Sequence, residues 1–258
     1  MRLIICLMCI FLFPILTFGQ TSSPPTQTAQ QSLIWLQGFS TVKFDSKSRW
    51  SFPLEIQIRR AETGATWQQF QFRGTVLFKA NDRVSLGGGY SYINTWPYGE
   101  QPVATEFPEH RLYEQLSINH KSLPKEHRFD HRLRLEQRYT RRINAATREL
   151  LDEYNYTNRF RYQGGVTIPL NKGADVWHQK KDDWIFYANN ELFFNFGENV
   201  QRNKFDQNRA AAGIGYYLSP NSNIRAGYLH QYIQKGDGVR FESNHIITLS
   251  LTYNFSFR

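Results

Sequence analysis

Residues Glu126–Tyr139 read EHRFDHRLRLEQRY, and charged and apolar side chains alternate along them. Successive side chains of an extended strand point to opposite faces, so this segment predicts a strand with two unlike sides. The ionic side holds Arg128, Asp130, Arg132, Arg134, Glu136 and Arg138. The apolar side holds Phe129, Leu133, Leu135 and Tyr139. A soluble sheet would turn the apolar side toward a core, whereas an outer-membrane barrel would turn it toward lipid and line its lumen with the charges.

The same alternation recurs about eleven times after residue 32, in segments of about ten to sixteen residues, which are long enough to cross a bilayer as tilted strands. In one such segment the even positions from Trp50 to Ile58 are apolar, while Glu55, Gln57 and Arg59 between them are polar. The repetition indicates that one architecture extends over nearly the whole chain.

Short and long connectors alternate between these segments. Lys79–Arg83, Ser122–Glu126 and Ser219–Asn223 are tight and rich in turn residues, whereas Thr95–Pro108 and Ile143–Glu153 are longer and polar. Bacterial outer-membrane barrels show this alternation because short turns face the periplasm and long loops face outside.

A secreted β-sandwich would also alternate, but three features favour a barrel. The segments are longer than the usual strands of globular sheets, and their polar faces carry more arginine than a core between two sheets needs. Aromatic residues also lie near the segment ends, where the girdles of a barrel would be: Trp50, Trp96, Tyr139, Tyr154, Trp184, Tyr232 and Tyr253. We therefore predict an all-β fold, an antiparallel transmembrane β-barrel of about 10–12 strands.

The first alternating segment, Ser32–Asp45, creates a problem of parity. Ten strands counted back from the carboxyl end lead to Trp50, so Ser32–Asp45 becomes an odd eleventh, with Leu33, Trp35 and Phe39 as its apolar positions. It either pairs within a twelve-stranded barrel, beside a strand that the pattern does not reveal, or lies inside the lumen. The sequence leaves both possibilities open.

The amino-terminal residues predict export. One arginine precedes an apolar run and then Thr-Phe-Gly-Gln, the layout of a cleaved signal peptide over residues 1–20. A membrane anchor is the alternative, but the run is short for a spanning helix. A polar segment over residues 21–32 follows, and the predicted barrel occupies residues 33–258. Both cysteines lie in the signal peptide, so the mature chain is expected to have no disulfide or thiolate chemistry.

The chain is basic, with 31 Lys and Arg against 22 Asp and Glu and a net charge of +9. These positive charges are scattered through alternating segments instead of forming a tail or a helical stripe, so nucleic acid is not the expected partner. For an exported barrel the expected partners are outer-membrane lipid or lipopolysaccharide, with the barrel assembly machinery during biogenesis. The identity of any small solute stays open.

Four motifs resemble a known family. They are EHRLYEQ at 109–115, HRLRLEQRY at 131–139, NELFFNF at 190–196 and FDQNRAAAGIGYYLSPN at 205–221. Together they are similar to the bacterial family called domain of unknown function 2490, in order and in spacing. The resemblance implies an exported outer-membrane barrel of a Gram-negative bacterium, often of the Bacteroidota, whose signal peptides are similar to the one ending here in Phe-Gly-Gln. It implies no activity.

Twelve charged residues of the polar faces are the candidate lumen network: Arg73, Arg128, Asp130, Arg132, Arg134, Glu136, Arg138, Arg159, Arg161, Glu191, Arg209 and Arg225. One interpretation is a set of cross-strand ion pairs that fix the register and fill the lumen. The other is a constriction whose excess of arginine favours anions. The alternation does not choose between a closed lumen and an anion path.

Other chemistry has weaker support. An outer-membrane lipid hydrolase would need Ser, His and an orienting group near the outer rim; His120 and Ser122 are the closest such pair, but they fall at a predicted periplasmic turn without an evident orienter. The histidines lack the spacing of a metal site. We expect no catalytic residues, no metal and no cofactor. An interaction protein whose loops Thr95–Pro108 and Ile143–Glu153 bind a partner is a further alternative.

Overall fold

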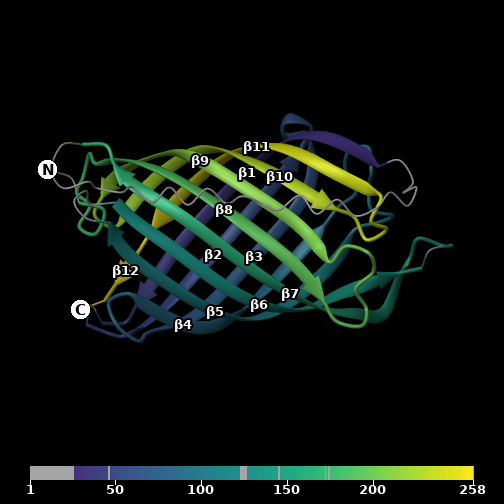
Figure 1. Cartoon of the computed structure of the whole chain (residues 1–258), viewed down its shortest axis with the longest axis horizontal. Coiled ribbons are helices and arrows are strands. Elements are labelled where there is room, and N and C mark those ends of the chain that lie inside the picture. Colours follow the sequence, from purple (N-terminus) through teal and green to yellow (C-terminus); the bar gives the residue numbers. More distant parts are fainter. Residues whose placement is uncertain are drawn as a thin grey trace, which may run out of the picture.

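The computed structural model describes residues 26–45, 47–122, 127–144, 146–171, 173 and 175–257. The predicted signal peptide, residues 1–20, lies outside the described residues. The described chain forms a closed β-barrel (Figure 1). Its long strands are β1 (Gln27–Lys43), β2 (Trp50–Ala61), β3 (Thr66–Lys79), β4 (Val84–Thr95), β5 (Phe107–Ser122), β6 (His127–Ile143), β7 (Leu150–Pro169), β8 (Trp184–Phe196), β9 (Phe205–Ser219), β10 (Ser222–Gln234) and β11 (Arg240–Tyr253). A short β12 (Phe255–Ser256) follows β11, and a 3-10 turn (Glu62–Gly64) joins β2 to β3.

The barrel closes through a parallel seam. Every strand from β1 to β11 is antiparallel to the next, but β1 pairs with β11 in parallel, with Gln27 opposite Arg240 and Phe39 opposite Thr252. In an up-and-down meander the first and last of an odd number of strands run in the same direction, so eleven strands can close only in this way. The prediction of about 10–12 strands is confirmed, whereas the wholly antiparallel pairing is wrong at this seam.

The seam also resolves the parity problem of residues 32–45. This segment belongs to β1, which is a strand of the wall with β2 on one side and β11 on the other. It does not lie inside the lumen, and its missing neighbour is the carboxyl-terminal strand itself. The strand begins at Gln27, so the barrel includes part of the segment 21–32 that precedes the predicted barrel boundary.

The two ends of the barrel differ. One end, here called the turn end, carries the connections 80–83 and 220–221 and the carboxyl-terminal residues, at the left of Figure 1. The other, here called the loop end, carries the connections 96–106, 144–149, 197–204 and 235–239. The connection 170–183 is an exception to the predicted alternation, because it is long and lies at the turn end.

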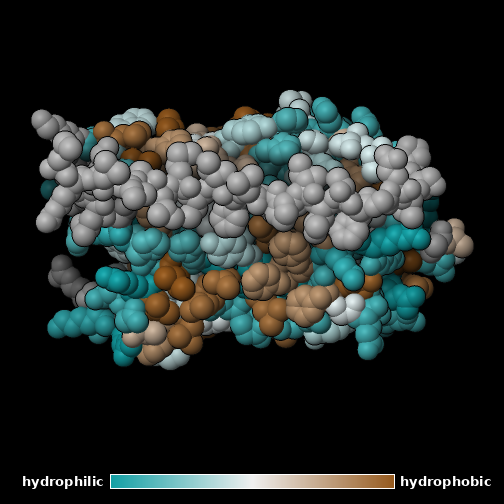
Figure 2. Space-filling model, in the orientation of Figure 1, coloured by the Kyte–Doolittle hydropathy of each residue, from teal (hydrophilic) through white to brown (hydrophobic). Residues whose placement is uncertain are grey.

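The outer wall is apolar and aromatic. Figure 2 shows apolar patches in the middle of one face and many hydrophilic residues toward both ends. Aromatic pairs lie near the strand ends: Trp50 with Phe78 and Trp184 with Tyr216 at the turn end, and Trp67 with Trp96 and Tyr139 with Tyr156 at the loop end. Among the described residues there is no helix that is long and apolar enough to cross a membrane.

Strand β1 turns several apolar residues inward. Leu33 and Trp35 are buried inside the barrel, where they pack with Ala61 and Ile246, and Phe39 lines a lumen cavity. The apolar positions of this segment therefore do not mark its outer face. The alternation of β1 is weak because Ile34 and Leu36 are apolar as well, and its pairing with β2 and β11 determines which side turns inward.

Candidate functional site

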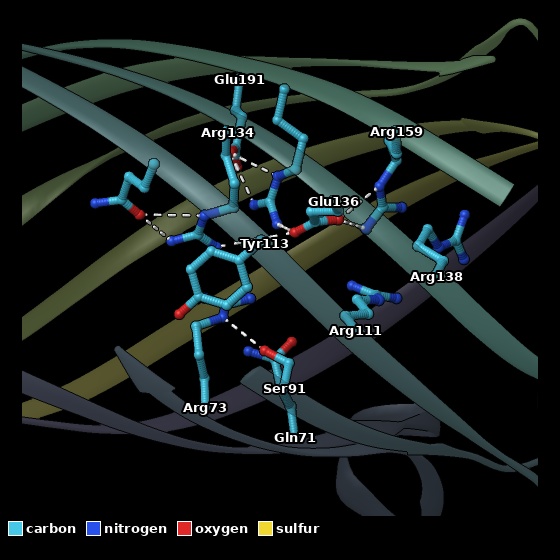
Figure 3. A network of polar contacts seen from close by, with 12 residues as sticks. Gln71, Arg73, Ser91, Arg111, Tyr113, Arg134, Glu136, Arg138, Arg159 and Glu191 are labelled. Atoms are coloured by element: carbon cyan, nitrogen blue, oxygen red, sulfur yellow. Dashed lines mark hydrogen bonds and ion pairs between the residues drawn. The ribbon is translucent and has the colours of Figure 1, made fainter. Parts of the chain in front are cut away.

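Glu136 of β6 is the centre of an ion-pair network on the lumen side of the barrel. Its side chain is 1% exposed. Nε and Nη2 of Arg159 donate hydrogen bonds of 2.9 and 2.6 Å to Oε2 of Glu136, and Nη1 of Arg161 donates one of 2.5 Å to Oε1. Figure 3 shows Glu136 between Arg159 and Arg134, with Arg134 over the ring of Tyr113. Two guanidiniums from β7 are thus held by one buried carboxylate of β6.

The network extends from Glu136 to β8 and β9. Oε1 of Glu191 accepts hydrogen bonds of 2.8 Å from Nη2 of Arg132 and from Nη2 of Arg161. Nη1 of Arg159 lies 2.8 Å from a carboxylate oxygen of Asp206. These pairs join strands that are neighbours or next neighbours, so the network follows the wall formed by β6 to β9.

Other ion pairs lie apart from this network. Glu109 of β5 binds Arg111 at 2.7 Å and Arg138 at 2.5 Å. Glu55 of β2 accepts a 2.6 Å hydrogen bond from Arg73 of β3. Near the turn end Arg128 and Asp130 are 3.0 Å apart within β6. The structure therefore brings Arg132, Glu136, Arg159, Arg161 and Glu191 together, and distributes other predicted residues among separate pairs.

Several arginines of the lumen are held by side-chain amides instead of carboxylates. Arg59 donates to Oε1 of Gln57 at 3.0 Å, Arg209 to Oε1 of Gln207 at 3.0 Å, and Arg225 to Oδ1 of Asn223 at 3.1 Å. Within the described residues no carboxylate oxygen lies within 4.0 Å of these three guanidiniums. An amide fixes the orientation of a guanidinium without neutralising its charge.

Arg134 is intermediate between these two groups. It is buried, and its guanidinium lies 4.3 Å from the centre of the Tyr113 ring. Nε donates to Oε1 of Gln115 at 3.1 Å, while Nη1 is 3.9 Å from Oε1 of Glu136, beyond hydrogen-bond distance. With Arg73 and Arg132 it lines a small cavity of about 190 Å³.

Three larger cavities succeed one another along the lumen. The loop-end chamber has a volume of about 360 Å³, the middle chamber about 270 Å³ and the turn-end chamber about 420 Å³. The charged lining of the loop-end chamber is Arg59, Arg73, Arg111, Arg138, Arg159, Arg161, Arg209, Lys235, Glu109, Asp206 and Glu242. The charged lining of the middle chamber is Arg59, Arg73, Arg132, Arg161, Arg209, Arg225, Glu55 and Glu191. Arg128, Asp130, Arg132 and Arg225 line the turn-end chamber.

The boundary between the loop-end and middle chambers consists of arginine. Four residues line both chambers, namely Arg59, Arg73, Arg161 and Arg209, and they are here called the waist. They come from β2, β3, β7 and β9, so both halves of the barrel contribute to the waist. A solute that moves between the two chambers must pass these guanidiniums.

Two buried aromatic rings support the waist. The Cζ atoms of Arg59 and Arg209 lie 4.0 and 5.1 Å from the centre of the Trp35 ring, and those of Arg161 and Arg209 lie 4.4 and 4.9 Å from the centre of the Phe193 ring. Trp35 is itself fixed by a 2.9 Å hydrogen bond from Nε1 to Oε1 of Gln68. Three of the four guanidiniums, those of Arg59, Arg161 and Arg209, therefore rest on buried rings.

At each end of the barrel a connection contacts a charged residue that lines the lumen. At the loop end the hydroxyl of Tyr98, in the connection 96–106, donates a 2.9 Å hydrogen bond to Glu242 of β11. At the turn end Trp177, in the connection 170–183, lies 5.7 Å from the guanidinium of Arg128, and its neighbour Val176 is fully buried. Tyr98 itself lines the loop-end chamber, whereas Trp177 contacts Arg128, which lines the turn-end chamber.

Sequence reasoning missed several lining residues. Glu109 and Arg111 could have been found, because EHRLYEQ alternates as clearly as the segment after it. Trp35 and Phe193 gave no signal, since an apolar residue in a weakly alternating strand fits either face. Asp206 stands at the start of β9, where one carboxylate does not establish a face.

Of the His120 and Ser122 pair considered for a lipid hydrolase, the structure places the histidine on the outer wall. His120 is an exposed residue of β5, and its ring stacks on those of Phe129 and His131 at 5.3 and 5.4 Å. The side chain of Ser122 lies outside the described residues. In the described part of the chain no three His, Cys, Asp or Glu residues are grouped so that they could hold a metal ion.

Comparison with known proteins identifies the family. No curated protein matches the chain. A solved structure described as "NanC porin structure in rhombohedral crystal form" is similar to it, with 15% sequence identity and a TM-score of 0.47 over 83% of this chain and 91% of that one. The model of a family described as "Protein of unknown function (DUF2490)" matches residues 33–242, which is most of the chain. The chain therefore belongs to the DUF2490 family.

Proposed function

We propose that the protein is an outer-membrane barrel that gives small anions a narrow passive path through its lumen. An apolar outer wall with aromatic residues near the strand ends suits contact with outer-membrane lipid or lipopolysaccharide. Strands β1 to β11 are long enough to span a bilayer as a barrel. The barrel assembly machinery would insert such a barrel. The family is described as one of unknown function, so the activity is argued from the lumen.

The observation that carries the proposal is the composition of the waist. All four residues shared by the loop-end and middle chambers are arginines. Fixed positive charge in a low-dielectric channel raises the local concentration of anions and lowers that of cations. No carboxylate neutralises Arg59 or Arg209 among the described residues, because their hydrogen-bond partners are neutral amides.

The arrangement of the ion pairs also favours an anion path over a closed lumen. The carboxylates bind arginines on the same strand, an adjacent strand or the next one, as Glu136 binds Arg159 and Glu191 binds Arg132. Pairs of this kind stiffen the wall on which they lie. The chambers on both sides of the waist have room for small solutes.

The test is ion selectivity in a planar lipid bilayer. Purified, folded protein is placed between two potassium chloride solutions of different concentration. The reversal potential is expected to have the sign of the chloride equilibrium potential, not that of potassium. The double substitution Arg59→Gln and Arg209→Gln should move that potential toward zero, because it removes the two uncompensated charges of the waist. Arg60→Gln removes the same charge from the opposite face of β2 and serves as the control. Absence of any conductance from the folded protein would refute the path.

A further inference from the structure

The four arginines of the waist differ in whether a carboxylate partners them. Of its four arginines, Arg73 and Arg161 have carboxylate partners at 2.6 and 2.5 Å. Arg59 and Arg209 have none within 4.0 Å among the described residues. We propose that Arg59 and Arg209 form a binding site for one small oxodianion, such as phosphate or sulfate. The inference deepens the proposed function and rests on it for the route by which the anion arrives.

Charge balance selects a dianion. Two guanidiniums without counter-charges stand at one boundary, and a desolvated charge is costly unless an opposite charge meets it. One dianion neutralises both, whereas a halide would leave one positive charge over. The carboxylates nearest the waist are already engaged: Glu55 binds Arg73, and Glu191 binds Arg161 and Arg132.

Donor geometry selects an oxoanion. A guanidinium presents parallel N–H groups in a fixed fork, which match two oxygens of a phosphate, sulfate or carboxylate group. Nη1 of Arg209 has no hydrogen-bond acceptor among the described residues, since Arg209 is held through Nε by Gln207. On Arg59, Nε and Nη2 both donate to Oε1 of Gln57, so an oxoanion would take the place of this neutral amide on the fork.

The two guanidiniums are positioned before any anion arrives. Both lie against the same indole ring, that of Trp35, with Cζ atoms 4.0 and 5.1 Å from its centre. Arg59 is further held by Gln57 and by Gln69, whose Oε1 accepts at 2.5 Å. A ligand therefore does not have to order these side chains, and less of the binding free energy is lost.

The adjacent chambers admit either a free anion or a small molecule that carries the group. Their volumes, about 360 and 270 Å³, exceed the space that phosphate or sulfate needs. The shared chemistry of the ligand is a tetrahedral oxodianion. The group can enter as an inorganic ion or as the phosphate of a small solute. Comparing the affinities of inorganic phosphate and glycerol phosphate distinguishes the two sources, and binding of either supports the site.

The experiment is calorimetric titration of the full barrel, folded in detergent at slightly alkaline pH, with sodium sulfate and sodium phosphate. We expect saturable binding of one anion per chain. Perchlorate, which is tetrahedral but carries one charge, should bind at least about tenfold more weakly. Arg59→Gln and Arg209→Gln should each weaken sulfate binding by at least about tenfold, while Arg60→Gln leaves it unchanged. Heat-modified migration on gels confirms that each variant is folded.

Failure of this inference is distinguishable from failure of the proposed path. A barrel that conducts anions in a bilayer but shows no saturable sulfate binding would overturn the oxodianion site and leave the path intact. Equal affinity for sulfate and perchlorate, or equal binding by Arg60→Gln and Arg209→Gln, would overturn it as well. Saturable binding by a barrel that passes no current would support the site while refuting the path.

Discussion

At the scale of single residues, the buried carboxylate of Glu136 is expected to contribute to stability. It is the carboxylate partner of both Arg159 and Arg161 and is 1% exposed. Glu136→Gln leaves two buried guanidiniums short of counter-charge, and we expect the free energy of unfolding to fall by about 3 kcal/mol. Urea unfolding in detergent, followed by tryptophan fluorescence, measures the change. Glu114→Gln, on the exposed face of β5, is the matched control; equal midpoints for the two variants would contradict the role of Glu136.

Asp237 offers a test of local electrostatics outside the wall. In the connection 235–239 it accepts hydrogen bonds from the backbone N–H groups of Arg240 and Val239 and from the side chain of Arg240, which lower its pKa to about 2 from 3.8. A carboxyl with a depressed pKa stabilises the fold above its unfolded pKa and loses that effect as pH falls through the folded value. We therefore expect this turn to persist at pH 3.8 and to loosen near pH 2, as seen by NMR titration of labelled aspartate. A midpoint near 3.8 would refute these contacts.

The residue scale also shows where sequence reasoning stops. The inward positions of Arg132, Glu136 and Arg138 followed from alternation alone, because charge and apolarity contrast sharply along β6. Their partners did not follow, because alternation fixes a face but not the register between strands. Arg138 accordingly binds Glu109 of β5 instead of joining the Glu136 network.

At the scale of elements, the parallel seam is the feature most open to direct test. Leu36 of β1 is opposite Leu249 of β11, and both are exposed on the outer wall. Cysteines at these two positions should cross-link on oxidation, since directly paired positions fall within disulfide reach. Cysteines at Leu36 and Leu251 are out of register by two residues and should not. Cross-linking of the second pair but not the first would refute the register.

Strand β1 explains why the topology was only partly predictable. Its neighbours have one mostly polar and one mostly apolar face, but Leu33, Ile34, Trp35 and Leu36 are all apolar. A pattern without contrast does not say which face turns inward, and it does not reveal a parallel partner at the far end of the chain. Strand number and the ionic lumen were therefore accessible from sequence, while closure and the aromatic supports of the waist were not.

At the scale of the whole molecule, the proposed orientation places the loop end at the cell surface. Thr147 is exposed at the loop end, and Asp82 is exposed at the turn end. In intact cells a membrane-impermeant maleimide should label Thr147→Cys and leave Asp82→Cys unlabelled until the outer membrane is permeabilised. Labelling of Asp82→Cys alone in intact cells would reverse the orientation.

The parallel seam separates Gln27 from Phe257 by the full height of the barrel, because β1 starts at the loop end whereas the residues after β11 reach the turn end. In a barrel with an even number of strands these two positions would be neighbours on one rim. A circular permutant of this chain would therefore need a linker that runs the length of the wall or through the lumen.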